Sequence, residues 1–266
     1  MSKLIEIKQL EIIVKKEKHT IVKKIDFSLD KGESLIILGQ SGCGKTMTCH
    51  CMMGLLDPKK FSVLGSIFYN GTDLLTLSAK EKRKIYGGEI AIIPQNPMSA
   101  FDPSMKIGKQ MLETLSLHID MPKSERKNTV LNALKKSGLD EVERVYHSYP
   151  FELSGGMLQR VLIAMVLMVN AKLVIADEPT TALDVVHRNE TIEVFRQLRE
   201  SGTAVLMVTH DFAAAVQLGG DMMIMNDGEI IETGKASEVL SAPKHSYTQK
   251  LIEASVLSSN IVEVAK

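Results

Sequence analysis

An eight-residue stretch near the start of the chain has the residue types that bind a polyphosphate. It reads Gly39, Gln40, Ser41, Gly42, Cys43, Gly44, Lys45 and Thr46, which matches the pattern G-x-x-x-x-G-K-[ST] in full. The glycines let successive backbone N–H groups turn toward one anion, and a following helix adds the positive end of its dipole. Lys45 can neutralise the β- and γ-phosphates, and the Thr46 hydroxyl can ligate Mg²⁺. The stretch therefore predicts a nucleotide site, whereas a loop that only turns the chain is the less favoured alternative.

Two adjacent carboxylates could supply the chemistry at that site. Asp177 and Glu178 come directly after the apolar run 173–176. Asp177 is suited to hold Mg²⁺, directly or through water, and Glu178 to orient and polarise the water that attacks a γ-phosphate. A solvated turn would be the better interpretation of two such acids alone. The phosphate motif reverses that preference.

A third stretch, 153–160, reads Leu-Ser-Gly-Gly-Met-Leu-Gln-Arg. Ser154, Gly155 and Gly156 stand where a helix is predicted to begin, so their backbone N–H groups could face an anion. A serine N-cap followed by glycines is the structural alternative, and it would be preferred if the stretch stood alone.

Alternating strand and helix patterns surround these motifs. Strand-like runs occupy 4–10, 21–29, 34–38, 65–69, 173–176 and 204–208, and helical patterns occupy 124–137, a stretch from about 156, and 185–200. Because ligands of such folds bind at the carboxyl ends of parallel strands, the motifs after 34–38 and 173–176 should lie together. The alternation predicts an α/β fold with a mainly parallel sheet, and the segment from 97 to about 150 is predicted to be a helical insertion.

Composition limits the possible classes of protein. The 266 residues favour one compact unit, and 32 basic residues balance 32 acidic ones, which argues against a nucleic-acid binder. The longest apolar run, 161–169, is about half the length of a membrane span and is predicted to be a buried helix. The N-terminal sequence lacks a secretory signal, and Cys43, Cys49 and Cys51 form neither a disulfide framework nor a zinc pattern. A reduced, cytoplasmic location is the expectation.

Six motifs in order show a family resemblance over nearly the whole chain. They are the phosphate loop 39–46, Gln95 within 93–97, the signature 153–160, the strand and acidic pair 173–178, the segment 182–184, and His210 within 209–211. In this order they resemble the ATPase family of ABC transporters. The resemblance implies a single P-loop NTPase domain over 1–266 with an antiparallel β region and an inserted helical subdomain. Its core would comprise 1–96 and 161–235, the helical subdomain about 97–160, and a C-terminal tail 236–266.

The resemblance also implies head-to-tail dimerisation. Each ATP would be held by the phosphate loop of one chain and by Ser154, Gly155 and Gly156 of the other. Asp184 would link the two sites across the interface. The isolated chain should therefore bind ATP but hydrolyse it slowly.

Roles in hydrolysis follow from the same resemblance. Glu178 would orient the attacking water, and His210 would contact the γ-phosphate and help hold the transition-state geometry. Gln95 would touch Mg²⁺ or the water, join Thr46 and Asp177 around the ion, and report nucleotide state to a transmembrane partner. Without the motif order, His210 would be interpreted as a structural histidine and Gln95 as a surface amide.

Further segments are similar to the peptide/nickel importer branch of this family. They are 95–103, 149–152 and 242–248, while 47–49, 175–181 and 183–186 look most like the first ATPase subunit of nickel importers. The implied function is to energise import of nickel or a metal–chelator complex, with oligopeptide or dipeptide import as the alternative. The implied partners are a second ABC ATPase subunit in a heterodimer, two transmembrane permeases and an extracytoplasmic binding protein. The subunit would be peripheral, on the cytoplasmic face of the cell membrane.

Two alternatives belong to other classes. A soluble ABC-type ATPase for DNA or ribosomes should carry a long coiled coil or a second cassette, and the chain has neither pattern. An iron–sulfur assembly ATPase is harder to exclude by layout, but 95–103 and 242–248 weigh against it. A non-hydrolysing regulatory cassette is disfavoured because both Glu178 and His210 are present.

Two features of the site depart from what the family usually offers. No aromatic residue that could stack on adenine occurs in 14–22, which leaves His19 as the only ring there. Cys43 lies inside the phosphate loop, where the helix N-terminus is expected to lower its thiol pKa. Alkylation of Cys43 is accordingly expected to block nucleotide binding, with ATP protecting the thiol.

Overall fold

The computed structural model describes residues 3–181 and 185–258. Within this part of the chain, six strands form the larger of two sheets, in the order β10-β9-β3-β8-β7-β6. Their bounds are Ser34–Leu38 for β3, Ile90–Ile93 for β6, Leu173–Asp177 for β7, Ala204–Thr209 for β8, Asp221–Asn226 for β9 and Glu229–Lys235 for β10. Neighbouring strands run parallel except β9 and β10, which pair antiparallel. The predicted mainly parallel sheet is confirmed, with an antiparallel edge.

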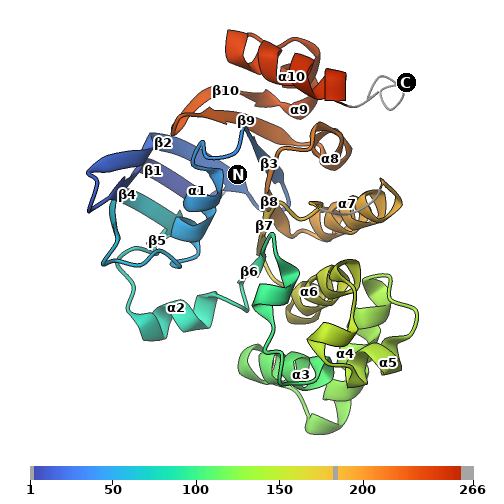
Figure 1. Ribbon diagram of the computed structural model, residues 1–266. Coiled ribbons are helices and arrows are strands. Elements are labelled where there is room, and N and C mark those ends of the chain that lie inside the picture. The colour runs from blue at the N-terminus through green and yellow to red at the C-terminus, as the bar shows by residue number, and fades with distance from the viewer. Residues whose placement is uncertain (1–2, 182–184, 259–266) are drawn as a thin grey trace.

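A second sheet is antiparallel and has the order β2-β1-β4-β5 (Figure 1). Its strands are β1 Lys3–Val14, β2 His19–Asp30, β4 Phe61–Tyr69 and β5 Thr72–Asp73. On β1, buried Ile5, Ile7, Leu10 and Ile12 are separated by more exposed polar residues. This is the pattern of a sheet that packs one face on the core and leaves the other to solvent. It accounts for the antiparallel β region implied by the sequence.

The parallel sheet is buried on both faces. On β3, Ile36 and Leu38 belong to one core cluster with α6, while Leu35 and Ile37 belong to a second cluster with α1 and the antiparallel sheet. A strand with two buried faces has an uninterrupted apolar sequence, as 34–38 does. The helices next to the sheet are α1 Lys45–Met52, α6 Gly155–Val169, α7 Val185–Glu200 and α8 Phe212–Leu218.

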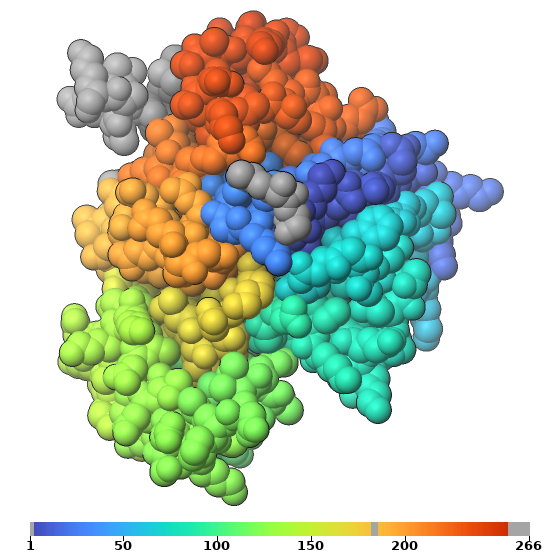
Figure 2. Space-filling model, turned by 180° about the vertical axis from the view of Figure 1, so that it is seen from behind, coloured from blue at the N-terminus to red at the C-terminus, as the bar shows by residue number. Residues whose placement is uncertain are grey.

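Most of the remaining helices lie at two ends of the molecule, whereas α2 Ala79–Ile85 lies between the antiparallel sheet and β6 (Figure 1). The others are α3 Ile107–His118, α4 Lys123–Lys136, α5 Val142–His147, α9 Ala236–Ser241 and α10 Ser246–Ser258, with 3₁₀ turns at Pro97–Ala100 and Pro150–Glu152. Helices α3, α4 and α5 lie next to α6, and α10 lies at the opposite end beside β10 (Figure 1). The view from behind shows the same separation between the green helical segment and the red C-terminal segment (Figure 2).

The apolar run 161–169 forms most of α6 and is largely buried, as expected. Within 3–181 and 185–258, no helix has the length and apolarity needed to cross a membrane. The structure also contains strands that the sequence patterns did not indicate, namely β6, β9 and β10. The domain boundaries at 96, 160 and 235 stay predictions.

Candidate active site

The phosphate loop connects β3 to α1 at the carboxyl edge of the parallel sheet. Gly42 and Gly44 have φ angles of 85° and 107°, in the left-handed region that favours glycine. A Cβ at Gly39 would lie 2.2 Å from the backbone oxygen of Met225, so the close approach of β9 also requires glycine there. Gly44 is the N-cap of α1 and supplies no side-chain cap to the helix N–H groups. The loop is thus shaped to present backbone donors to an anion.

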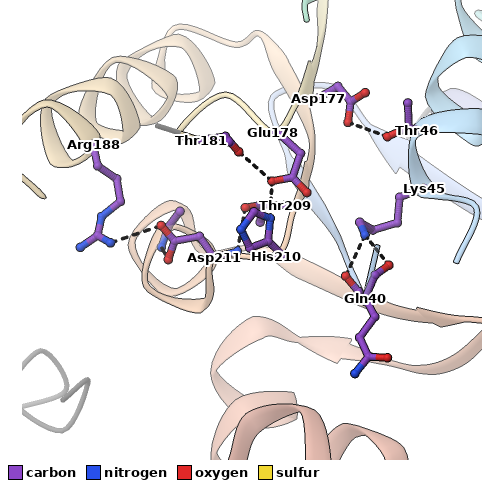
Figure 3. A network of polar contacts seen from close by, with 12 residues as sticks. Gln40, Lys45, Thr46, Asp177, Glu178, Thr181, Arg188, Thr209, His210 and Asp211 are labelled. Atoms are coloured by element: carbon purple, nitrogen blue, oxygen red, sulfur yellow. Dashed lines mark hydrogen bonds and ion pairs between the residues drawn. The ribbon is translucent and has the colours of Figure 1, made fainter. Parts of the chain in front are cut away.

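Lys45 holds its ammonium group inside this loop. The residue is 5% exposed, and its Nζ donates to the backbone oxygens of Gly39 at 2.7 Å and Gln40 at 2.9 Å (Figure 3). The loop borders a cavity of about 750 Å³ that Gln95, Glu178 and His210 also line. Residues predicted from four separate motifs therefore meet around one cavity that is large enough for a nucleotide.

Asp177 and Thr46 form an oxygen-rich pair beside Lys45. The Thr46 hydroxyl donates to Oδ1 of Asp177 at 3.2 Å (Figure 3). Asp177 is buried, and this burial raises the pKa of its carboxyl, while the Thr46 hydrogen bond opposes the rise. A carboxylate and a hydroxyl are ligand types that Mg²⁺ prefers, and a divalent cation would compensate the buried charge. These residues fit a magnesium site.

Glu178 is held in an unusual backbone conformation that aims its carboxylate across the sheet edge. Its φ angle is 51°, in the left-handed region, and its N–H donates to the oxygen of Val208 at 2.8 Å. The side chain is 11% exposed, and Oε2 lies 2.5 Å from Nδ1 of His210. Thr181 donates its hydroxyl to the same oxygen at 3.1 Å. Left-handed non-glycine residues are uncommon and persist where surrounding contacts impose them, often at functional sites.

The turn after β8 fixes the position of His210. The carboxylate of Asp211 caps α8 by accepting from the N–H groups of Ala213 at 2.8 Å and Ala214 at 3.1 Å. Arg188 on α7 contacts the other carboxylate oxygen of Asp211 at 3.3 Å (Figure 3). With its neighbour anchored, His210 keeps a side chain that is 63% exposed and accessible to a bound molecule.

The signature residues line a second pocket, which also includes Gln95 and Thr181. Ser154 caps α6 by accepting from the N–H of Met157 at 3.3 Å, and both Ser154 and Gly155 are exposed. Neither they nor Gly156 is among the residues that line the cavity at the phosphate loop. One chain therefore does not bring its own signature to its own phosphate loop. Asp184 lies outside the described residues.

Comparison with known proteins agrees with this geometry. Residues 22–181 match the family described as ABC transporter. The chain belongs to this family. It is 38% identical to the metal-staphylopine import system ATP-binding protein CntD of Staphylococcus aureus, over 94% of this chain and 92% of that protein. It is also 38% identical to the oligopeptide transport ATP-binding protein OppD of Bacillus subtilis, over 95% of this chain and 72% of that protein.

Solved ABC cassettes share the fold. The ATP-binding cassette MJ0796, in a dimeric post-hydrolysis state bound to ADP and Pi, is 27% identical with a TM-score of 0.77, over 87% of this chain and 98% of that one. The predicted fold class, an ABC-type nucleotide-binding domain with an antiparallel β region and added helices, is confirmed. The assignment of this ABC protein as an ATPase is confirmed as well.

One prediction about the phosphate loop of this ABC ATPase is wrong. Burial raises the pKa of the Cys43 thiol, and this exceeds the lowering effect of Lys45, whose Nζ lies 3.9 Å from the sulfur. The side chain is 6% exposed, so a position close to a helix N-terminus does not make the thiol acidic or accessible. The sequence showed where Cys43 stands along the chain but not how deeply its side chain is buried.

We therefore expect Cys43 to react slowly with iodoacetamide in the folded ABC ATPase. At pH 7.5 its labelling rate should be at least about tenfold below the rate in urea, because both the thiolate fraction and access are reduced. Mass spectrometry of the tryptic peptide at timed intervals measures this rate. Equal rates in folded and unfolded protein would contradict the expectation.

Sequence reasoning missed several residues at the cavity. Phe212, Asp227, Gly228 and Leu251 line it together with the phosphate loop. Asp227 and Gly228 form the β9–β10 turn, and an Asp-Gly pair between two short runs is a hairpin signal that could have located them. Leu251 is on α10, and no sequence signal connects it to a nucleotide site.

Proposed function

We propose that this chain is the ATP-hydrolysing subunit of an importer for nickel or a metal–chelator complex. The observation that carries the ATP-hydrolysing role is the 2.5 Å pair between Glu178 and His210 at the edge of the phosphate-loop cavity. The match to a metal-staphylopine import ATPase over nearly the full length of both chains supports the metal cargo. Oligopeptide or dipeptide cargo is the second candidate, because peptide transport ATPases match at the same level of identity.

The phosphate loop and its neighbours would hold Mg²⁺–ATP. Backbone N–H groups of 39–46 would bind the phosphates, and Lys45 would transfer its Nζ contacts from the loop carbonyls to the β- and γ-phosphates. Thr46, Asp177 and Gln95 would hold Mg²⁺, which when bound neutralises charge on the phosphates. The fit rests on the Thr46–Asp177 pair, while exposed Gln95 lines the same cavity.

Glu178 would orient the attacking water. Its Oε2 is fixed by two contacts, one with His210 and one with Thr181, so the other carboxylate oxygen is available to accept a proton from water. Since Nδ1 of His210 faces Glu178, its Nε2 is the nitrogen available to a γ-phosphate oxygen. Phosphoryl transfer depends mainly on positioning and charge stabilisation, and this pair supplies both.

The site would be completed by a second cassette. Exposed Ser154 and Gly155, with Gly156, would present the N-terminus of α6 to the ATP held by the partner's phosphate loop. The separation of these residues from the chain's own cavity supports this arrangement. Asp184 is proposed to link the two composite sites.

The proposed partners are a second ABC ATPase subunit, two transmembrane permeases and an extracytoplasmic binding protein. The chain would lie on the cytoplasmic face of the cell membrane as a peripheral subunit. Affinity capture of the tagged protein from gently solubilised membranes, followed by mass spectrometry, tests this. Recovery of two multi-span permeases and a second ATPase supports the importer. Recovery of only soluble partners would refute it in favour of a soluble ABC-type ATPase, such as an iron–sulfur assembly factor.

His19 is proposed to contact the adenine base. It lines the cavity together with Val14, Ile21 and Gly228, and its side chain is exposed. We expect His19→Ala to raise the Kd for ATP about three- to tenfold, and His19→Tyr to lower it, because a larger ring gives more stacking area. Titration with a fluorescent ATP analogue measures both values. An unchanged Kd in both variants would contradict the assignment.

A further inference from the structure

The C-terminal segment folds back toward the phosphate loop, although it lies outside the residues 22–181 that match the family. Glu232 on β10 fixes the point of return. Its two carboxylate oxygens accept from the N–H groups of Lys244 at 2.8 Å and His245 at 3.0 Å. His245 in turn accepts from the N–H of Tyr247 at 3.1 Å, so its ring caps the start of α10. The first turn of α10 is therefore set relative to the parallel sheet.

This anchoring turns one face of α10 inward. Thr248 is fully buried, and its hydroxyl oxygen has no hydrogen-bond partner within the described part of the chain. The hydroxyl oxygen of Tyr247 is also buried and makes no hydrogen bond of normal geometry. Burial raises the pKa of this hydroxyl, while the backbone N–H of Gln40 lowers it and the Cys43 thiol raises it, so both of these phosphate-loop groups lie near it. A buried hydroxyl without a partner is costly, so a group that completes its hydrogen bond would stabilise this arrangement.

Leu251 extends the same face by one turn. Its partly buried side chain lines the cavity that the phosphate loop borders. Leu251 stands four residues after Tyr247, so the two side chains lie on one side of the helix. The adjacent Lys250 is exposed and is not among the residues that line the cavity. A single helix thus contacts both the loop and the cavity.

From these contacts we propose that α10 is part of the nucleotide site, with Leu251 contacting the bound nucleotide and Tyr247 positioning the phosphate loop through Gln40. Docking of α10 and binding of ATP then stabilise each other. By linkage, the factor by which a docked α10 tightens ATP binding equals the factor by which ATP tightens docking. The proposal rests on the cavity being the ATP site and is independent of the transported cargo.

Two measurements on the full-length protein test this coupling. In the Glu178→Gln background, Mg²⁺–ATP should slow hydrogen exchange of the 246–253 amides at least about threefold relative to nucleotide-free protein. Leu251→Ala should raise the Kd for Mg²⁺–ATP between about three- and tenfold, because it removes apolar contact area from the cavity. Tyr247→Phe, which deletes only the hydroxyl, should raise the Kd about two- to threefold. Lys250→Ala on the same helix is the matched control and should leave the Kd unchanged.

The outcomes separate this coupling from a merely structural role. If α10 only stabilises the fold, Leu251→Ala lowers the melting temperature while the Kd for ATP and the exchange of 246–253 stay the same, and the inference is overturned. If Leu251→Ala does not fold, Tyr247→Phe still provides a test. A wild-type Kd for ATP in Tyr247→Phe, together with unchanged hydrogen exchange of the 246–253 amides, also overturns the inference. Wild-type protein that fails to bind ATP would refute the proposed nucleotide site itself.

Discussion

Glu178→Gln should abolish ATP turnover by the assembled transporter while leaving ATP binding intact. We expect the rate to fall at least about 100-fold, since a neutral amide cannot accept a proton from the attacking water. The amide oxygen can still accept from His210 or Thr181, which contact the carboxylate at 2.5 and 3.1 Å, so the local fold should persist. Trapped ATP should also hold the two cassettes together. Phosphate release and size-exclusion chromatography with ATP measure the two effects.

A matched control is Glu193→Gln on α7. Glu193 is an exposed carboxylate paired with Arg196 at 3.1 Å and does not line the cavity, so its neutralisation should leave turnover unchanged. Wild-type turnover in the Glu178 variant would show that another group orients the water, and the role assigned to Glu178 would have to be abandoned. A variant that lost ATP binding as well would indicate that Glu178 supports the phosphate loop instead.

The sequence was most informative where local pattern and chemistry coincide. The run 34–38 is a strand with the predicted bounds, because a strand buried on both faces has a continuous apolar sequence that ends at the loop glycines. Helix α7 likewise has the predicted bounds, Val185–Glu200. The motif residues at 39–46 except Cys43, together with those at 95, 178 and 210, line one cavity as the rule for parallel sheets requires.

The sequence was least informative about features that depend on tertiary contacts. The short strand β6 and the methionine-rich β9 become strands through pairing with β7 and β3 and carry little periodic pattern of their own. Burial of Cys43 depends on how the loop packs, so residue type and helix position gave the wrong direction for its pKa. The left-handed backbone of Glu178 depends on its contact with Val208 across the sheet.

The sequence pattern also does not predict that the C-terminal segment lies near the phosphate loop. The stretch 242–248 is similar in sequence to one importer branch, but this similarity does not predict its structural role. In the fold, Glu232 anchors this stretch and turns Tyr247 toward Gln40. Tyr247 and Gln40 are more than 200 positions apart, and such a separation leaves no local signal in one sequence.

Gly155→Asp should separate ATP binding from ATP turnover. A Cβ at Gly155 meets no heavy atom within 4 Å, so the fold has room for the new side chain. An acidic residue in the first turn of α6 also favours the helix, because it interacts well with the positive N-terminal end. The isolated chain should therefore bind ATP with unchanged Kd. In the assembled complex, the carboxylate would face the γ-phosphate held by the partner cassette and repel it.

We expect turnover at that composite site to fall at least about 100-fold, in line with the loss of a group that stabilises transition-state charge. Gly155→Ala is the matched control, because it adds the Cβ without charge and should cost much less. Phosphate release by the purified transporter, compared with ATP titration of the isolated chain, measures the difference. If Gly155→Asp supports normal turnover, α6 does not point at the partner's nucleotide. The isolated chain would then have to contain its whole catalytic site, although its own signature lies outside its nucleotide cavity.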